Sequence, residues 1–141
     1  MKFYAVIDTN VIVSSMLKAY SIPEKILDFV FSKLIVPILN QEILNEYRDV
    51  LLRDKFGFKH EDVNKVISFI KENSIFLERQ ETIEDFIDED DVVFYEILMS
   101  ARNNVDAYLV TGNIKHYPAK SYVVTPKEML EIIEKEINKN R

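Results

Sequence analysis

Acidic side chains next to predicted strands and helices are the residues of this sequence best suited to carry chemistry. Asp8 directly follows an apolar, strand-like run at residues 3–7 and precedes a helical pattern. In a parallel sheet, a residue at this position points into the crevice at the carboxyl end of its strand, where α/β folds bind ligands. Asp8 is therefore a candidate site residue, and the alternative is that it only caps the following helix.

Glu46 is a second candidate, and helix geometry separates it from two other acids. A helix is predicted from the N-cap Asn40 to about residue 52. At about 100° per residue, Glu46 lies roughly 100° from the centre of the apolar face, whereas Glu42 and Asp49 lie roughly 140° and 160° away. Glu46 therefore lies at the border between core and solvent. It can reach into a crevice or simply flank its helix.

Four consecutive acids, residues 88–91, precede an apolar helix predicted at residues 92–101. Negative charge at a helix N-terminus is favourable by about 0.3–1 kcal/mol, so capping accounts for part of the pattern. Four acids exceed that need, and a divalent cation would relieve their mutual repulsion. Asp91 is nearest to the buried helix and is the candidate for a fixed inward ligand, with Asp88 in a supporting role.

Two further candidates flank the strand predicted at residues 107–111. Asn113 follows the strand, where its amide oxygen could ligate a metal weakly or serve only as a turn residue beside Gly112. Asp106 lies at the opposite end of the strand, a position that is more often structural. All these candidates offer oxygen ligands, which suit Mg²⁺ or Mn²⁺ rather than zinc.

Several other chemistries are excluded by residue types that the chain lacks. It has no cysteine, which removes disulfides and thiolate catalysis, and its two glycines cannot form a nucleotide-binding loop. The two histidines, His60 and His116, are not at metal-ligand spacing. Asn10 stands where a haloacid-dehalogenase-type phosphatase needs its second aspartate, which argues against that alternative class.

The predicted elements alternate between strands and helices, which favours a single domain over residues 1–141. This pattern indicates an α/β fold, a three-layer α/β/α sandwich with a central, mainly parallel sheet. Strands are predicted at residues 3–7, 34–36, 75–77, 107–111 and 121–124. Helices are predicted at residues 11–17, 22–31, 40–52, 61–73, 92–101 and from residue 126 onward.

Composition and charge indicate where the protein is located and what it can bind. The chain has no signal peptide and no apolar stretch near 20 residues, so we expect a soluble, cytoplasmic protein away from membranes. Its net charge of −6 argues against nucleic-acid binding, which relies on basic residues. A bound divalent cation reverses the local charge of an acidic site, which weakens that objection.

Taken in order, these motifs resemble the PIN-domain family, in particular its prokaryotic, toxin-like (VapC-related) branch. The resemblance covers nearly the whole chain. It is carried by residues 6–11 (Val-Ile-Asp-Thr-Asn-Val), 43–47 (Ile-Leu-Asn-Glu-Tyr), 88–91, 94–96 (Phe-Tyr-Glu), 106–113 and 124–126 (Val-Thr-Pro).

The resemblance implies a metal-dependent ribonuclease with an acidic pocket for one or two Mg²⁺ or Mn²⁺ ions. Asp8, Glu46 and Asp91 fall on the acidic positions of the family, as catalytic residues and metal ligands. Asn113 stands where the family usually has aspartate, which implies one well-held metal ion and weaker binding of a second. Asp106 is a secondary candidate ligand by the same comparison.

Further implications concern supporting residues and partners. Thr9 matches a residue of the family that helps to hold the active site in place. Lys115 and His116 could steer RNA toward the site or lie in a solvated loop. A basic cluster, defined by Arg48, Arg53, Lys55 and Lys59, could form a substrate rim or an ordinary exposed face. The expected biology is the toxin component of a toxin–antitoxin pair, with a small cognate antitoxin and a homodimer. The alternative is a catalytically impaired module of the same fold that binds RNA or protein.

Overall fold

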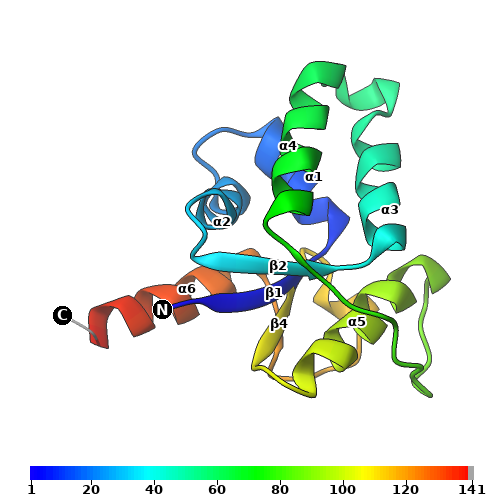
Figure 1. Cartoon of the computed structure of the whole chain (residues 1–141), viewed down its shortest axis with the longest axis vertical. Coiled ribbons are helices and arrows are strands. Elements are labelled where there is room, and N and C mark those ends of the chain that lie inside the picture. The colour runs from blue at the N-terminus through cyan, green and yellow to red at the C-terminus, as the bar shows by residue number, and fades with distance from the viewer. Residues whose placement is uncertain (140–141) are drawn as a thin grey trace.

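A sheet of five parallel strands forms the centre of the molecule, in the order β3-β2-β1-β4-β5 (Figure 1). The computed structural model describes residues 1–139. The strands are β1 (Phe3–Ile7), β2 (Ile35–Leu39), β3 (Ile75–Phe76), β4 (Ala107–Val110) and β5 (Val123–Val124). Since every pairing is parallel and helices connect most of the strands, the predicted α/β architecture is confirmed.

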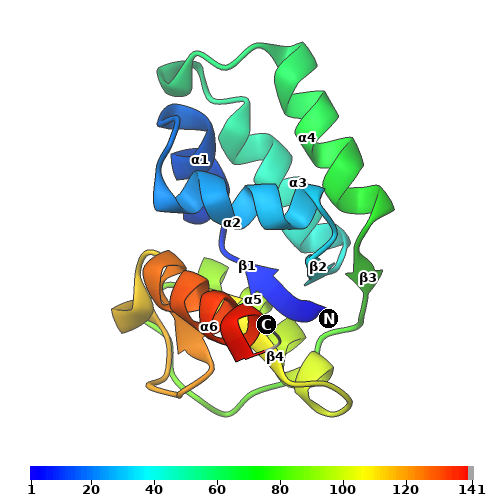
Figure 2. The ribbon, with the colours of Figure 1, turned by 90° about the vertical axis from the view of Figure 1, so that its left-hand side faces the viewer.

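Helices cover both faces of this sheet. The first four lie on one side, α5 lies on the other, and α6 packs against α2 (Figure 2). The α-helices are α1 (Thr9–Leu17), α2 (Ile22–Phe31), α3 (Gln41–Leu51), α4 (His60–Glu72), α5 (Val92–Arg102) and α6 (Pro126–Lys139). Three short 3₁₀ turns are η1 (Asp54–Phe56), η2 (Glu89–Asp91) and η3 (Ile114–His116). Within the described part of the chain, no helix is long and apolar enough to cross a membrane.

β1 is the central strand, and the order in which strands are added to the sheet reverses at this strand. Ala5, Val6 and Ile7 are buried because neighbouring strands and helices cover them from every side. The chain adds β2 and β3 on one side of β1 and then returns to add β4 and β5 on the other. Such a reversal of strand order is where open α/β sheets bind ligands.

β2 is longer than the sequence predicts, and Pro37 explains why its second half is hard to recognise. Proline cannot donate to a strand ladder, so an apolar run containing it reads poorly as an inner strand. In the structure Pro37 pairs with Ala5, while β3 pairs only with Ile38 and Leu39. Pro37 therefore lies where β2 has a neighbour on one side only, and the strand tolerates it.

Candidate active site

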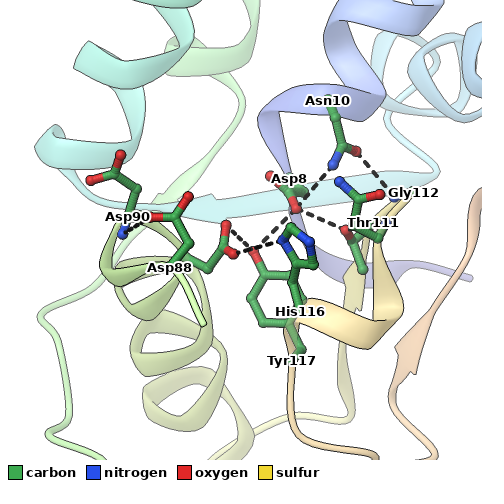
Figure 3. Close-up of polar contacts among 10 residues, drawn as sticks. Asp8, Asn10, Asp88, Asp90, Thr111, Gly112, His116 and Tyr117 are labelled. Carbon is green, nitrogen blue, oxygen red and sulfur yellow. Dashed lines mark hydrogen bonds and ion pairs between the residues drawn. The ribbon is translucent and has the colours of Figure 1, made fainter. Parts of the chain in front are cut away.

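Asp8 lies at the carboxyl end of β1, beside the end of β4, and it is only 6% exposed. It occupies the position that precedes α1, yet its carboxylate makes no capping hydrogen bond. This geometry does not favour the alternative that Asp8 only caps the helix. Its Oδ2 instead accepts hydrogen bonds from Thr111 Oγ1 (2.8 Å), Tyr117 OH (3.1 Å) and Asn10 Nδ2 (3.3 Å), as Figure 3 shows.

The loops after β1 and β4 are tied together around Asp8. Asn10 Oδ1 accepts a hydrogen bond from the backbone N–H of Gly112 at 3.0 Å. A Cβ atom at Gly112 would lie 3.3 Å from that oxygen, so glycine permits the close approach of the two loops. Thr111 Oγ1 in turn accepts from the backbone N–H of Asn113. Each side chain that orients Asp8 is thus itself held in place.

Glu46 lies half-buried on α3, whereas Glu42 and Asp49 of the same helix are exposed. The helical angles computed from the sequence therefore identified the border position correctly. Thr9, at the start of α1, donates a short hydrogen bond from its hydroxyl to Glu46 Oε2. The Tyr47 hydroxyl donates to the carbonyl oxygen of Ile7, which anchors α3 to the end of β1. These contacts bring Glu46 to the edge of the sheet that holds Asp8.

Asp91 reaches the same edge from η2, at the start of α5. Its Oδ2 lies 3.2 Å from Nδ1 of His116, and its Oδ1 lies 3.5 Å from the hydroxyl of Tyr117. Asp88 does not join this contact. Its side chain instead accepts a hydrogen bond from the backbone N–H of Asp90 and caps the turn (Figure 3).

The three carboxylates are strongly affected by burial and by one another. Burial raises the pKa of Asp8, against the hydrogen bonds from Thr111 and Tyr117 that lower it. Burial also raises the pKa of Glu46 and of Asp91, and the negative charge of Asp8 adds to both shifts. Among residues 1–139, no lysine or arginine forms an ion pair with any of these three acids. His116 is the one basic side chain that contacts them, at Asp91, where it lowers the pKa, and Asp8 and Glu46 have no such partner among these residues.

The donor chemistry of this site fits a hard divalent cation. Asp8, Glu46 and Asp91 offer only oxygen ligands, and Asp8 Oδ1 receives no side-chain hydrogen bond from the described residues. Among the described residues, no group of three or more acids or histidines lies close enough together to form a complete set of metal ligands. Asp8, Glu46 and Asp91 are the residues of this edge that would hold Mg²⁺ or Mn²⁺.

Other predicted site residues lie elsewhere. Asp106 precedes β4 at the opposite edge of the sheet, where its side chain is 98% exposed and lies 4.0 Å from Arg102. The structure does not bring Asp106 to the carboxylates, because a parallel strand places its two ends at opposite edges. Asn113 is exposed and joins the network through its backbone N–H alone. Lys115 is exposed in η3, one residue before His116.

Thr111 and Tyr117 contact Asp8, and sequence reasoning did not identify either of them as part of the candidate site. Thr111 follows β4 just as Asp8 follows β1, and the register of the two parallel strands, with Ile7 opposite Val110, sets the two residues side by side. Strand register was thus a signal that could have identified Thr111. Tyr117 had no comparable signal, because it lies in irregular chain after η3.

An open hollow of about 450 Å³ lies beside Glu46. It is lined mainly by residues of α3, η2 and the chain after β3, and it holds two arginines, Arg53 and Arg79. Arg79 is paired with Glu42 and Glu96, whereas Arg53 forms no ion pair within residues 1–139. One member of the basic cluster, Arg53, therefore lines the same hollow as Glu46.

Comparison with known proteins agrees with this geometry. Residues 4–115 match the PIN domain family. A protein of Methanocaldococcus jannaschii that is described as uncharacterized is 28% identical over 153 aligned residues, which span 98% of this chain and 96% of that protein. No solved structure matches the chain. PIN domains are generally nucleases, and the acidic edge found here is consistent with such an activity. The match spans most of the chain, which therefore belongs to the PIN domain family.

Proposed function

We propose that this PIN domain is an endoribonuclease that uses Mg²⁺ or Mn²⁺ to hydrolyse RNA phosphodiester bonds. One observation carries the proposal. Asp8, Glu46 and Asp91 come from three separate elements to one sheet edge, their pKa values are raised, and no lysine or arginine of residues 1–139 pairs with them. Carboxylates with raised pKa values at a ligand-binding edge are typical of functional sites.

The chain's own residues would act mainly by orientation. Thr111 and Asn10 fix one oxygen of Asp8, and Thr9 fixes one oxygen of Glu46. A bound divalent cation would lower the pKa of a water molecule and neutralise charge on the scissile phosphate. Since the carboxylates are held by hydrogen bonds in advance, less reorganisation is needed when a cation and a phosphate arrive.

Basic side chains near two of the acids support an RNA substrate. Arg53 lines the hollow next to Glu46, and Lys115 lies in η3 beside His116, which contacts Asp91. Cationic side chains of this kind contact phosphates and steer a polyanion toward a site. We propose that Arg53 and Lys115 contact the RNA backbone on opposite sides of the cleavage point.

Cleavage of RNA with and without metal tests the proposal. The wild-type protein is expected to cleave in Mg²⁺ or Mn²⁺ and to stop in excess chelator, and Asp8→Asn is expected to lower the rate at least about 100-fold. Asp106→Asn is the matched control, because it removes an equal charge from an exposed position at the other sheet edge. Cleavage that is independent of metal, or equal in wild-type and Asp8→Asn proteins, would contradict the proposal.

A catalytically impaired binding module is the second candidate, and Asn113 favours it. The residue that follows Thr111-Gly112 is a neutral amide whose side chain makes no hydrogen bond among the described residues. In that case the wild-type protein binds RNA in a gel-shift assay without cleaving it. Asn113→Asp would then restore metal-dependent cleavage, since it supplies the missing carboxylate.

We also propose that the nuclease is a toxin held in check by a small antitoxin, that it forms a homodimer and that it acts in the cytoplasm. This part of the proposal is supported by the resemblance to the toxin-like branch of the family. Growth arrest upon expression of the wild-type chain, but not of Asp8→Asn, is the expected result. Light scattering of the purified protein tests the dimer.

A further inference from the structure

Tyr117 contacts the acidic site from a segment to which the proposed function gives no role. Its hydroxyl lies 3.1 Å from Asp8 Oδ2 and 3.5 Å from Asp91 Oδ1. The side chain is only 6% exposed, so its hydroxyl faces the two carboxylates rather than bulk solvent. The phenol group is therefore shared by two acids that come from β1 and from the start of α5 (Figure 3).

The hydroxyl has one proton, so it can donate to only one of these acceptors at a time. The shorter contact identifies Asp8 Oδ2 as the principal acceptor. Thr111 and Asn10 donate to the same oxygen, and Tyr117 therefore completes a set of three donors. With Oδ2 engaged in this way, Asp8 is left with Oδ1 for a further ligand.

Aromatic packing holds the ring of Tyr117 in place. The ring meets Phe86 edge-on, with centroids 6.1 Å apart and an interplanar angle of 83°. Phe86 in turn packs against Tyr95 of α5 at 5.5 Å. The backbone N–H of Tyr117 donates to the carbonyl of Ile114, which closes the turn of η3. A ring fixed by packing and by the backbone can define the position of its hydroxyl closely.

The preceding residue completes the arrangement. His116 contacts Asp91 at 3.2 Å, while Tyr117 contacts Asp8 at 3.1 Å. Two consecutive residues thus reach two acids that are far apart in the sequence. Because two adjacent residues make both contacts, this segment links the positions of the two carboxylates.

We propose that Tyr117 is a positioning residue, whose hydroxyl fixes the orientation of Asp8 and its spacing from Asp91 so that the pair can hold a divalent cation. The proposal rests on the proposed function for the identity of the cation. Tyr117 acts through Asp8, and it does not itself touch the substrate. Hydrogen-bonding partners of metal ligands typically contribute about 10–100-fold to metal affinity.

Tyr117→Phe tests this proposal, because it removes the hydroxyl and retains the packed ring. The probe is Mn²⁺ alone, titrated into the full chain and followed by calorimetry and by the electron paramagnetic resonance signal of free Mn²⁺. We expect the dissociation constant to rise about 10-fold. We also expect RNA cleavage to fall at low Mn²⁺ and to recover as Mn²⁺ is raised, which a general loss of structure would not produce.

Tyr95→Phe is the matched control. Tyr95 is also buried and contacts Phe86, but it makes no hydrogen bond to Asp8 or Asp91. Its loss of a hydroxyl should leave Mn²⁺ affinity unchanged. Equal affinity of Tyr117→Phe and wild type would overturn the proposal, as would an equal loss of affinity in both tyrosine variants.

A double-mutant cycle provides an independent test. If Tyr117 acts through Asp8, then Tyr117→Phe should weaken Mn²⁺ binding in the wild-type background and have no further effect in Asp8→Asn. Additive losses would overturn the proposal. Failure of the wild-type protein to cleave RNA would instead overturn the proposed function alone, because these Mn²⁺ titrations contain no RNA.

Discussion

Glu96 and Asp8 are equally buried, at 5% and 6% exposure, yet their surroundings differ. Glu96, on α5, is paired with the guanidinium of Arg79 at 2.6 Å, and its second oxygen accepts from the backbone N–H of Thr82 at 2.9 Å. Asp8 has three hydrogen-bond donors, and all of them are neutral. Of these two carboxylates, only Glu96 has a neutralising partner.

Under the proposed function, this difference separates a structural acid, Glu96, from an acid that binds a ligand, Asp8. Arg79 also contacts Glu42, so the pair at Glu96 fastens the chain after β3 to α3 and α5. Burying a charge without a counter-ion is costly, and folds avoid it unless the charge serves another purpose. Asp8 carries its charge without a counter-ion despite this cost. We attribute the lack of a counter-ion in the protein to a role of Asp8 in binding a cation from solution.

The largest effect is expected on breaking the paired site. Arg79→Met leaves Glu96 buried without its counter-ion and should lower the free energy of unfolding by about 2–3 kcal/mol. This loss of stability is smaller than the loss on breaking a fully buried ion pair, because the Arg79 side chain is 37% exposed. Urea unfolding measures it. Lys65→Met is the control, since its ion pair with Glu61 is exposed and should contribute less than about 0.5 kcal/mol.

A change in stability of the opposite sign is expected on replacing Asp8, which has no ion-pair partner. Asp8→Asn removes a buried, uncompensated charge and should raise the free energy of unfolding of the metal-free protein by about 0.5–2 kcal/mol at neutral pH. Asp106→Asn, at an exposed position, should leave stability nearly unchanged. A destabilised Asp8→Asn protein would show that Asp8 serves the fold rather than a ligand.

The third prediction concerns pH. The pKa values of Asp8, Glu46 and Asp91 are raised by folding, so the folded protein binds protons at these groups more tightly than the unfolded chain. These groups should therefore stabilise the metal-free protein increasingly as the pH falls through their raised pKa values. The gain is complete below the ordinary values of 3.8 for Asp and 4.5 for Glu.

The stability difference between wild-type and Asp8→Asn proteins measures the share of Asp8 in this effect. In chelator, the advantage of Asp8→Asn should shrink as the pH is lowered from about 7 to about 4, because protonation relieves the same charge in the wild type. A difference that stays constant over this range would contradict the assignment of a raised pKa to Asp8.

The smallest effect on stability is expected from removing the Thr9 hydroxyl, which is a neutral hydrogen-bond donor to Glu46. Thr9→Val keeps the shape of the side chain and removes its hydroxyl, which donates to Glu46. Stability should fall by about 0.5 kcal/mol, at the low end for a hydrogen bond, because Glu46 is only half-buried. Thermal unfolding checks this value. A loss as large as that of Arg79→Met would erase the distinction between the two kinds of site.

Local patterns in the sequence were enough to predict much of the fold and part of the site. Alternating strands and helices predicted the parallel sheet, and the angle of Glu46 on its helix matched the half-buried position found in the structure. Both inferences depend on the periodic spacing of residues within one helix or strand. That spacing does not depend on the contacts that the element makes in the folded protein.

Contacts between distant segments could not be predicted in this way. Arg79 and Glu96 are 17 residues apart and belong to no common element, so neither spacing nor periodicity indicates their pairing. The contact of Tyr117 with Asp8 depends on where the irregular chain after η3 returns to the sheet. Such positions follow from the packing of the whole molecule.

The contacts of Asp8 also have a consequence for biosynthesis. Its partners Thr111 and Tyr117 lie 103 and 109 residues later in the chain. Synthesis proceeds from the N-terminus, so a nascent chain carries Asp8 long before it carries the side chains that orient it. The site can be assembled only when most of the protein has emerged from the ribosome, and incomplete chains that end before Thr111 lack it.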